Sequence, residues 1–258
     1  MMVVTGPLCS VRTIWAPLVW VGRVQGWMGI DLVLSSGFLA FASHAGVLRA
    51  IEDLGVGIEG ICGTSSGALV GALWASGLSA EEVLAVVTER PPLSWVSGHV
   101  APWRGLFRLD PMIAELEARL PASFSALTCP LAVGVVHAAD RSHQLLTDGP
   151  LPRAVAASCA VPWLFAPVDV GGQILADGAV ADRTGLAAWR ALRPDRHPVI
   201  HLVDRSAGAR AEPSADPLWV VRSPRSRASL WSLGDARARF ERSRRAAHAV
   251  LAAQLQGR

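Results

Sequence analysis

Short apolar runs alternate with stretches of helical periodicity along most of this chain. Apolar runs bounded by turn residues predict buried strands; they lie at 30–35, 56–62, 131–137 and 199–203. Apolar residues that recur every three or four positions predict helices; these lie at 44–54, 66–76, 153–159 and 186–192. Because strands and helices alternate, we expect an α/β protein with a three-layer α/β/α fold around a central, mostly parallel sheet.

Two further strands are predicted in the second half of the chain. A strand at 142–146 is expected beside the one at 131–137. The pair Gly171-Gly172 predicts the turn of a hairpin, because glycine accepts the left-handed backbone that such turns need. The second strand of this hairpin, at 173–177, ends on Asp177-Gly178.

The pattern places one domain at residues 30–204, between two ends of different character. Residues 1–29 are apolar and rich in Trp, but charged residues and prolines interrupt them, and no run is long enough to span a bilayer. We expect the native chain to begin at Met28, with an interfacial anchor as the alternative interpretation of this poorly defined extension. Residues 205–258 are rich in Arg and contain a basic helix at 235–255, which we expect to pack on the same domain.

The composition is typical of a folded protein with a large core, because 51% of the 258 residues are hydrophobic and 17% are charged. A net charge of +3 is too small to indicate a nucleic-acid partner. The four cysteines show no C-x-x-C spacing and the histidines form no ligand cluster, so we expect neither a metal nor a cofactor. Unpaired thiols in apolar runs favour a reducing compartment, which predicts a cytoplasmic protein.

The segment Gly63-Thr64-Ser65-Ser66-Gly67 fits the pattern G-x-S-x-G between a predicted strand and a predicted helix. In a nucleophile elbow this context turns the chain sharply and holds the serine hydroxyl out for attack. Ser65 would then lie at a helix amino terminus, where free N–H groups and the helix dipole favour a developing oxyanion. The alternative interpretation is a Gly/Ser turn before an ordinary core helix.

A serine nucleophile needs a base, and the first candidate is Asp177. An Asp-Gly pair at a strand end can place a carboxylate in a cleft, where partial burial raises its basicity. An ordinary turn residue is the alternative. A second possibility is a Ser-His-Asp triad in which His201 or His197 follows the acid. His201 lies inside an apolar strand, which favours a buried structural histidine.

Several stretches together resemble the patatin-like phospholipase family, and in particular a bacterial patatin-like lipid acyl hydrolase. The resemblance runs from Asp31 to Trp189 and depends on five stretches, which are 44–55, 63–69, 75–77, 157–162 and 177–179. It implies a Ser-Asp dyad without histidine, in which Ser65 is the nucleophile and Asp177 of the Asp177-Gly178-Ala179 motif is the base. It also implies hydrolysis of a fatty acyl ester through an acyl-enzyme, and the three-layer patatin-like fold.

The loop after the first strand departs from the family pattern. The family reads Gly-Gly-Gly-x-Arg-Gly there, whereas residues 36–41 of this chain read Ser-Gly-Phe-Leu-Ala-Phe. Gly37 keeps its glycine and Ala40 stands at the arginine position. The backbone N–H groups of Gly37 and Phe38 are the expected oxyanion donors, together with that of Ser66, but Phe38 restricts the loop dihedrals. One lost donor costs about 3–4 kcal/mol of transition-state stabilisation.

Three functional hypotheses follow. The first is a serine lipid acyl hydrolase of the phospholipase A, lysophospholipase or esterase type, acting on a lipid or acyl-ester substrate through Ser65 and Asp177. The second is a weak or inactive relative that binds acyl chains or a protein partner, because the oxyanion loop is altered. The third is an esterase with a conventional triad through His201.

Two segments suggest contact with lipid. Residues 91–108 carry prolines and two tryptophans on an irregular stretch, which fits either a lid over an acyl chain or a surface loop. The basic helix could meet anionic head groups peripherally or could be a solvated helix on the domain; its arginines are Arg237, Arg239, Arg242, Arg244 and Arg245.

Overall fold

The computed structural model describes residues 29–100, 103, 105–196, 198–204 and 219–256. The predicted start at Met28 and the triad candidate His197 lie outside the described residues. No helix among the described residues is both long and apolar enough to cross a membrane.

The centre of the fold is an eight-stranded mixed sheet with the order β10-β9-β1-β2-β5-β8-β7, in which β6 also pairs with β5. The strands from β10 to β5 pair in parallel, whereas β6, β8 and β7 join antiparallel. The strands are β1 Ile30–Leu34, β2 Ile58–Thr64, β5 Leu131–His137, β6 His143–Leu146, β7 Val168–Val170, β8 Gln173–Asp177, β9 Pro198–Val203 and β10 Trp219–Ser223. A two-stranded ribbon is formed separately by β3 Ser97–Gly98 and β4 Phe107–Arg108.

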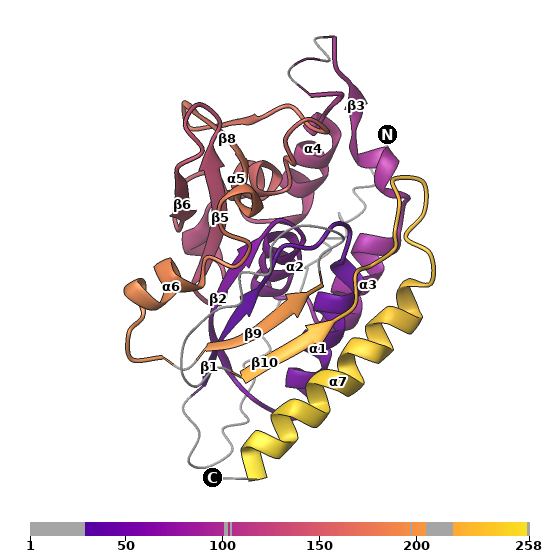
Figure 1. The fold of residues 1–258 in the computed structure, drawn as a ribbon, viewed down its shortest axis with the longest axis vertical. Coiled ribbons are helices and arrows are strands. Elements are labelled where there is room, and N and C mark those ends of the chain that lie inside the picture. The colour runs from indigo at the N-terminus through magenta and orange to yellow at the C-terminus, as the bar shows by residue number, and fades with distance from the viewer. Residues whose placement is uncertain (1–28, 101–102, 104, 197, 205–218, 257–258) are drawn as a thin grey trace, which may run out of the picture.

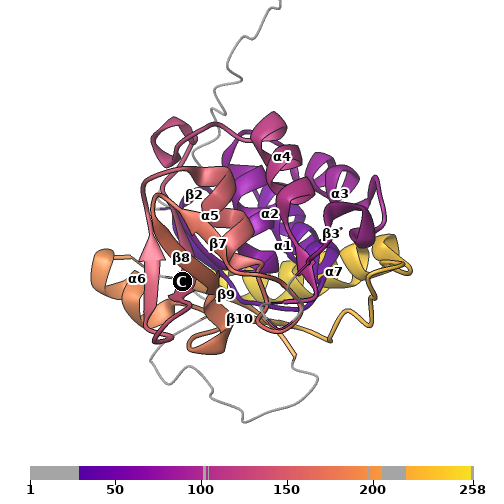
Figure 2. The same cartoon turned by 90° about the horizontal axis from the view of Figure 1, so that it is seen from above.

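Helices cover both faces of the sheet, so the fold has three layers, as Figures 1 and 2 show. The helices are α1 Phe41–Asp53, α2 Ser66–Ala75, α3 Ala80–Thr88, α4 Asp110–Arg119, α5 Leu151–Ser158, α6 Leu186–Leu192 and α7 Ala236–Gln256, with short 3₁₀ turns at Pro92–Trp95, Phe124–Ala126 and Gly178–Val180. Side chains alternate along β1: Leu32 and Leu34 join the large core under α1, α2, α5 and α7, whereas Val33 joins a smaller core under α6.

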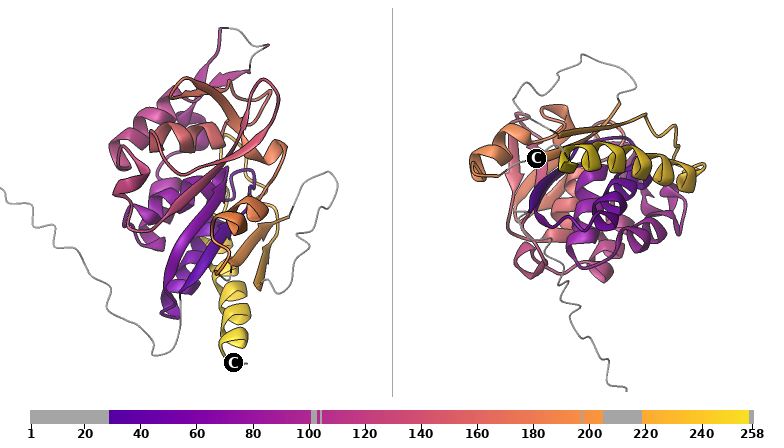
Figure 3. Two further views of the ribbon diagram at one scale, coloured as in Figure 1. Left: turned by 90° about the vertical axis from the view of Figure 1, so that its left-hand side faces the viewer. Right: turned by 90° about the horizontal axis from the view of Figure 1, so that it is seen from below.

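The carboxyl-terminal segment is built into this architecture. Strand β10 forms one edge of the sheet beside β9, and α7 lies along α1 (Figure 3, right). The two helices approach so closely that a Cβ on Gly46 would overlap the carbonyl oxygen of Phe240. The side chain of Phe240 is fully buried. Helix α7 is therefore packed on the domain by its apolar face.

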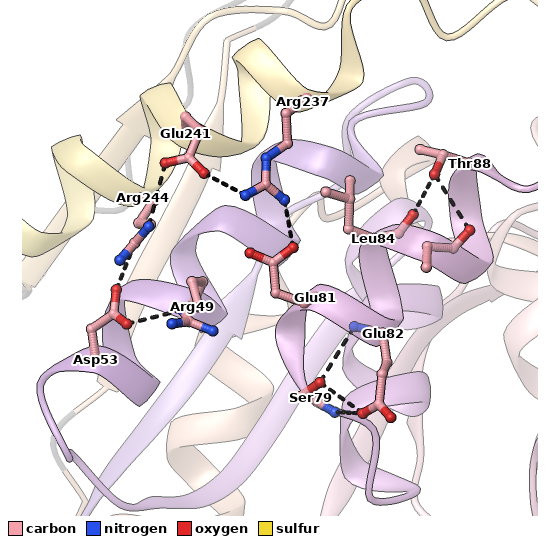
Figure 4. A network of polar contacts seen from close by, with 11 residues as sticks. Arg49, Asp53, Ser79, Glu81, Glu82, Leu84, Thr88, Arg237, Glu241 and Arg244 are labelled. Carbon is pink, nitrogen blue, oxygen red and sulfur yellow. Dashed lines mark hydrogen bonds and ion pairs between the residues drawn. The ribbon is translucent and has the colours of Figure 1, made fainter.

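Ion pairs join the polar side of α7 to the neighbouring helices (Figure 4). Arg237 pairs with Glu81 at 2.5 Å and Arg244 pairs with Asp53 at 2.6 Å, and Glu241 contacts both arginines. Arg239 donates to the carbonyl of Leu233, so three arginines of the basic helix are engaged within the fold. Arg242 and Arg245 are exposed. Figure 4 also shows the capping box of α3, in which Ser79 and Glu82 exchange hydrogen bonds.

Helix α1 and strand β10 differ from the prediction. Helix α1 begins at Phe41, not at His44, because the chain turns at Gly37–Ala40 and the next two side chains already face the core. Strand β10 was not predicted, since its short apolar run follows an Arg- and Pro-rich tract. What makes it a strand is the open edge of β9, which needs hydrogen-bond partners.

Candidate active site

The sheet topology brings Ser65 and Asp177 together. Both β2 and β8 pair with the same edge of β5, because the opposite edge is taken by β6 at Val133 and Val135. Strand β2 runs parallel to β5 and ends with Thr64 opposite Gly134, whereas β8 runs antiparallel and ends with Asp177 opposite Val135. The carboxyl ends of the two strands therefore meet at adjacent positions of β5.

The backbone of Ser65 has the strained geometry of an elbow. It adopts φ 56° and ψ −120°, a region that side chains other than glycine rarely occupy. The turn is tight: a Cβ on Gly63 would lie 2.6 Å from the carbonyl carbon of Gly67, and a Cβ on Gly67 would overlap the backbone of β1. Any side chain at Gly63 or Gly67 would therefore clash with neighbouring backbone atoms, so both positions of the elbow need glycine.

Ser158 ties the elbow to β5, and sequence reasoning had given it no role. The N–H of Ser65 donates to Ser158 Oγ at 2.8 Å, and this hydroxyl donates to the carbonyl of Gly134 at 2.7 Å. Ser158 is fully buried, so both hydrogen bonds are shielded from water. Its role could have been suspected from the sequence, because Ser158 lies in the stretch 157–162, one of the stretches that carry the family resemblance.

Asp177 is buried beside Ser65 and held by backbone contacts. Its Oδ1 accepts the N–H of Ala179 at 2.8 Å, and its own N–H donates to the carbonyl of Ala160. Burial raises the pKa of the Asp177 carboxyl from 3.8 to about 6, partly offset by the Ala179 N–H and by a side-chain hydrogen bond with Ser65. Gly178 must be a glycine, because a Cβ there would lie 2.6 Å from the backbone of Gly134.

The loop between β1 and α1 lies next to the elbow and is held from two sides. Arg183 donates to the Ser36 carbonyl at 2.8 Å, and Ser226 Oγ donates to the Phe38 carbonyl at 2.6 Å. Among the described residues, the N–H groups of Gly37, Phe38 and Ser66 have no hydrogen-bond partner. These three donors are thus available at the elbow.

Two pockets meet at Ser65. The first is narrow and apolar, and its lining includes Phe41, Trp95, Met112 and Phe165. The second is an open pocket of about 660 Å³ with a more polar lining, and Asp177 lies in its wall but not in the wall of the first. Ser65, Phe38 and Val161 line both pockets.

The sequence profile described as patatin-like phospholipase matches residues 32–188, which is more than half of the chain. The chain belongs to this family. It is 30% identical over 234 residues to the uncharacterized NTE family proteins Rv1063c of Mycobacterium tuberculosis and Mb1092c of Mycobacterium bovis, a match that covers 85% of this chain and 63% of each relative. The chain therefore spans less than two thirds of the length of these relatives.

A solved structure agrees with the fold of this patatin-like chain. VipD from Legionella pneumophila superimposes with a TM-score of 0.56 at 13% identity, covering 87% of this chain and 67% of VipD. The family resemblance predicted from the motifs is confirmed, and so is the three-layer α/β/α fold with a mostly parallel sheet.

A triad through His201 is not formed in this patatin-like chain. His201 Nδ1 lies 2.8 Å from His44 Nδ1, and His201 Nε2 lies 2.9 Å from Ser223 Oγ, so both ring nitrogens are occupied away from Ser65. His44 Nε2 in turn contacts Ser66 Oγ at 3.2 Å, and Ser223 contacts Ser243 of α7. The histidine is thus part of a buried hydrogen-bond chain that runs from α7 to the start of α2.

Burial keeps His44 and His201 neutral. It lowers the pKa of His44 to about 3, and it lowers the pKa of His201 well below the ordinary value, helped by the neighbouring His44. A neutral pair can share one proton between its Nδ1 atoms without charge repulsion. Across the part of the chain that the structure describes, no three His, Cys, Asp or Glu side chains gather in an arrangement that could hold a metal ion.

Proposed function

We propose that this protein is a serine lipid acyl hydrolase that acts through a Ser65–Asp177 dyad. The observation that supports this most is the pairing of a strained Ser65 with a buried Asp177 whose pKa is raised to about 6. A carboxylate with this pKa is ionised at neutral pH and is a stronger base than an exposed one. Activation of a serine by a neighbouring base is the general requirement for nucleophilic catalysis.

In the first half of the reaction, Ser65 Oγ attacks the ester carbonyl and its proton passes to Asp177. The N–H groups of Gly37, Phe38 and Ser66 stabilise the negative oxygen of the tetrahedral intermediate, assisted by the amino terminus of α2. The C–O bond to the alcohol then breaks, and Asp177 returns the proton to the leaving oxygen. In the second half, Asp177 takes a proton from water, and the water oxygen attacks the carbonyl carbon of the acyl-enzyme. The bond between the acyl carbon and Ser65 Oγ then breaks, Asp177 returns the proton to Ser65 Oγ, and the fatty acid leaves.

The test is the hydrolysis of medium-chain p-nitrophenyl esters by the purified protein. We expect Ser65→Ala to reduce kcat to the background rate, because no other hydroxyl takes the place of the nucleophile. Ser125→Ala, a change of the same size at an exposed serine of the 3₁₀ turn 124–126, is the matched control and should leave the rate unchanged. Equal rates for wild type and Ser65→Ala would refute the proposal.

The competing proposal is a relative that binds acyl chains or a protein without turnover. It is motivated by Phe38 and Ala40 in the loop where the family pattern has glycine and arginine. Labelling by a fluorophosphonate probe separates the two proposals, because the probe reacts only with an activated serine. Labelling of Ser65 favours the hydrolase, and its absence from correctly folded protein favours the binding protein.

Peripheral contact with an anionic membrane remains a prediction, as does a cytoplasmic location. Arg242 and Arg245 of α7 are exposed and are the side chains that we expect to make such a contact. Binding to vesicles with and without anionic lipid tests it. Equal binding to both vesicle types would reject an electrostatic contact.

A further inference from the structure

The two pockets at Ser65 assign a direction to the bound ester. The leaving alcohol must receive its proton from Asp177, and Asp177 lines the open pocket only. The alcohol half of the substrate therefore belongs in the open pocket. The acyl chain belongs in the narrow pocket, whose lining is apolar.

The lining of the open pocket includes two arginines that the dyad does not use. Arg225 and Arg227 come from the segment after β10, and both are exposed. Within the described parts of the chain, no hydrogen bond or ion pair engages either guanidinium. A third arginine of the lining, Arg183, donates to the carbonyls of Ser36 and Val203 and so brings its charge to the same pocket.

The backbone that carries Arg225 and Arg227 is fixed. Ser226 between them is buried, and its Oγ donates to the Phe38 carbonyl at 2.6 Å while it accepts the N–H of Ala228 at 3.2 Å. Arg227 adopts φ 54°, a left-handed conformation that costs free energy in a residue other than glycine. The two hydrogen bonds of the buried Ser226 hydroxyl therefore hold this backbone beside the oxyanion loop and offset the cost of the Arg227 conformation.

We propose that Arg225 and Arg227 form a phosphate-binding subsite for the alcohol half of the substrate, so that the preferred ester is an acylglycerol phosphate. This inference rests on the proposed hydrolase function of the same site. A guanidinium presents a planar fork of N–H donors that matches phosphate oxygens, and two forks can hold one phosphate from two sides. The carboxylates in the lining, Asp177 and Asp204, are fewer than the three arginines, so the pocket favours an anion.

The test compares a monoacylglycerol phosphate with the neutral monoacylglycerol that carries the same acyl chain, both below their micelle concentrations. In wild type, we expect kcat/KM to be higher for the phosphate ester. In the double variant R225Q/R227Q, the ratio of the two kcat/KM values should fall by about tenfold or more, as the loss of charge-assisted hydrogen bonds predicts. The matched control is R90Q/R141Q, which removes the same charge from two exposed positions outside the open pocket and should keep the ratio.

A binding measurement separates this inference from the proposed function. Ser65→Ala protein is titrated with the monoacylglycerol phosphate. The same titration is made with a combined variant that carries Ser65→Ala together with R225Q/R227Q. We expect a weaker Kd by about tenfold in the combined variant. If hydrolysis of both esters is absent but this difference in Kd is found, the proposed function fails and the phosphate subsite stands.

Inorganic phosphate distinguishes a head-group site from a site for the free anion. We expect it to compete weakly with the phosphate ester in wild type, because it lacks the acyl chain in the apolar pocket. The proposal is overturned if the ratio of the two esters is the same in wild type and R225Q/R227Q. It is also overturned if inorganic phosphate binds as tightly as the ester, since the arginines would then be a site for the free anion. Thermal unfolding of each variant verifies that it is folded.

Discussion

At the scale of single residues, the site combines two unfavourable states. Ser65 has a left-handed backbone, and Asp177 is a carboxyl buried to 2% exposure. Neither is stable without its surroundings, and each is held by fixed partners, which are Ser158 for the elbow and Ala179 for the carboxylate. Such strain at one point, supported by its neighbours, is typical of functional sites.

The raised pKa of Asp177 predicts the pH dependence of hydrolysis. The carboxyl must be ionised to accept the Ser65 proton, so kcat/KM should fall about tenfold per pH unit below pH 6 and level off above it. A discontinuous ester assay between about pH 4 and pH 8 measures this. If kcat/KM instead falls with a midpoint near pH 3.8, the ordinary pKa of the carboxyl, burial does not raise the basicity of Asp177.

The same shift predicts that Asp177→Asn stabilises the protein. A carboxyl whose folded pKa lies above its unfolded value costs stability as pH rises from 3.8 to about 6, because the unfolded chain releases the proton first. Removing the charge should raise the free energy of unfolding by about 3 kcal/mol near pH 8, and by about half of that near pH 5. Urea denaturation at both pH values measures it. A pH-independent difference would contradict the mechanism.

At the scale of elements, α7 is connected to the elbow through the protein interior. The hydrogen-bond chain Ser243, Ser223, His201, His44 and Ser66 crosses from α7 through β10, β9 and α1 to α2. All five side chains are at most 2% exposed. Removing one side chain from this hydrogen-bond chain leaves a buried polar atom without a partner, which lowers the free energy of unfolding by about 1–3 kcal/mol.

The close contact between α1 and α7 predicts that Gly46→Ala destabilises the protein. Alanine is about 1 kcal/mol better than glycine in a helix interior, but its Cβ would overlap the carbonyl of Phe240. We expect the free energy of unfolding to fall by about 1–3 kcal/mol. Gly57→Ala is the control, because its Cβ would have no atom closer than 4.0 Å. A higher stability of Gly46→Ala would mean that the helices can separate without cost.

At the scale of the whole molecule, the segment after β9 completes three parts of the protein. It provides the edge strand β10, the helix α7 and the wall of the open pocket that contains Ser226. Three side chains of α7, those of Phe240, Ala247 and Leu251, are fully buried. The family profile ends at residue 188, before all of these elements.

We therefore predict that a chain ending at Asp204 does not fold cooperatively. It would expose the face of α1 that α7 covers and leave His201 without Ser223. Urea unfolding followed by near-ultraviolet circular dichroism should show no sharp transition, in contrast to the full chain. A cooperative transition in the shortened chain would show that the segment is an addition to a domain that is already complete.

Much of the architecture could be predicted from the sequence because it depends on local patterns. The apolar runs gave β1, β2, β5 and β9 within a few residues, and the glycine pair placed the turn between β7 and β8. Ser65 and Asp177 were candidates for the same reason, since each lies at a predicted strand end in a glycine motif, Ser65 between Gly63 and Gly67 and Asp177 before Gly178. Alternation of strands and helices was enough to predict three layers.

Other properties were decided only by the tertiary structure, because they depend on contacts between distant parts of the chain. The sequence names Ser65 and Asp177, but they become neighbours because β2 and β8 share one edge of β5. It contains His201 in the order of a triad, but packing turns that ring toward His44 and Ser223. Side-chain chemistry is therefore readable from sequence, whereas the pairing of side chains is fixed by strand register and burial.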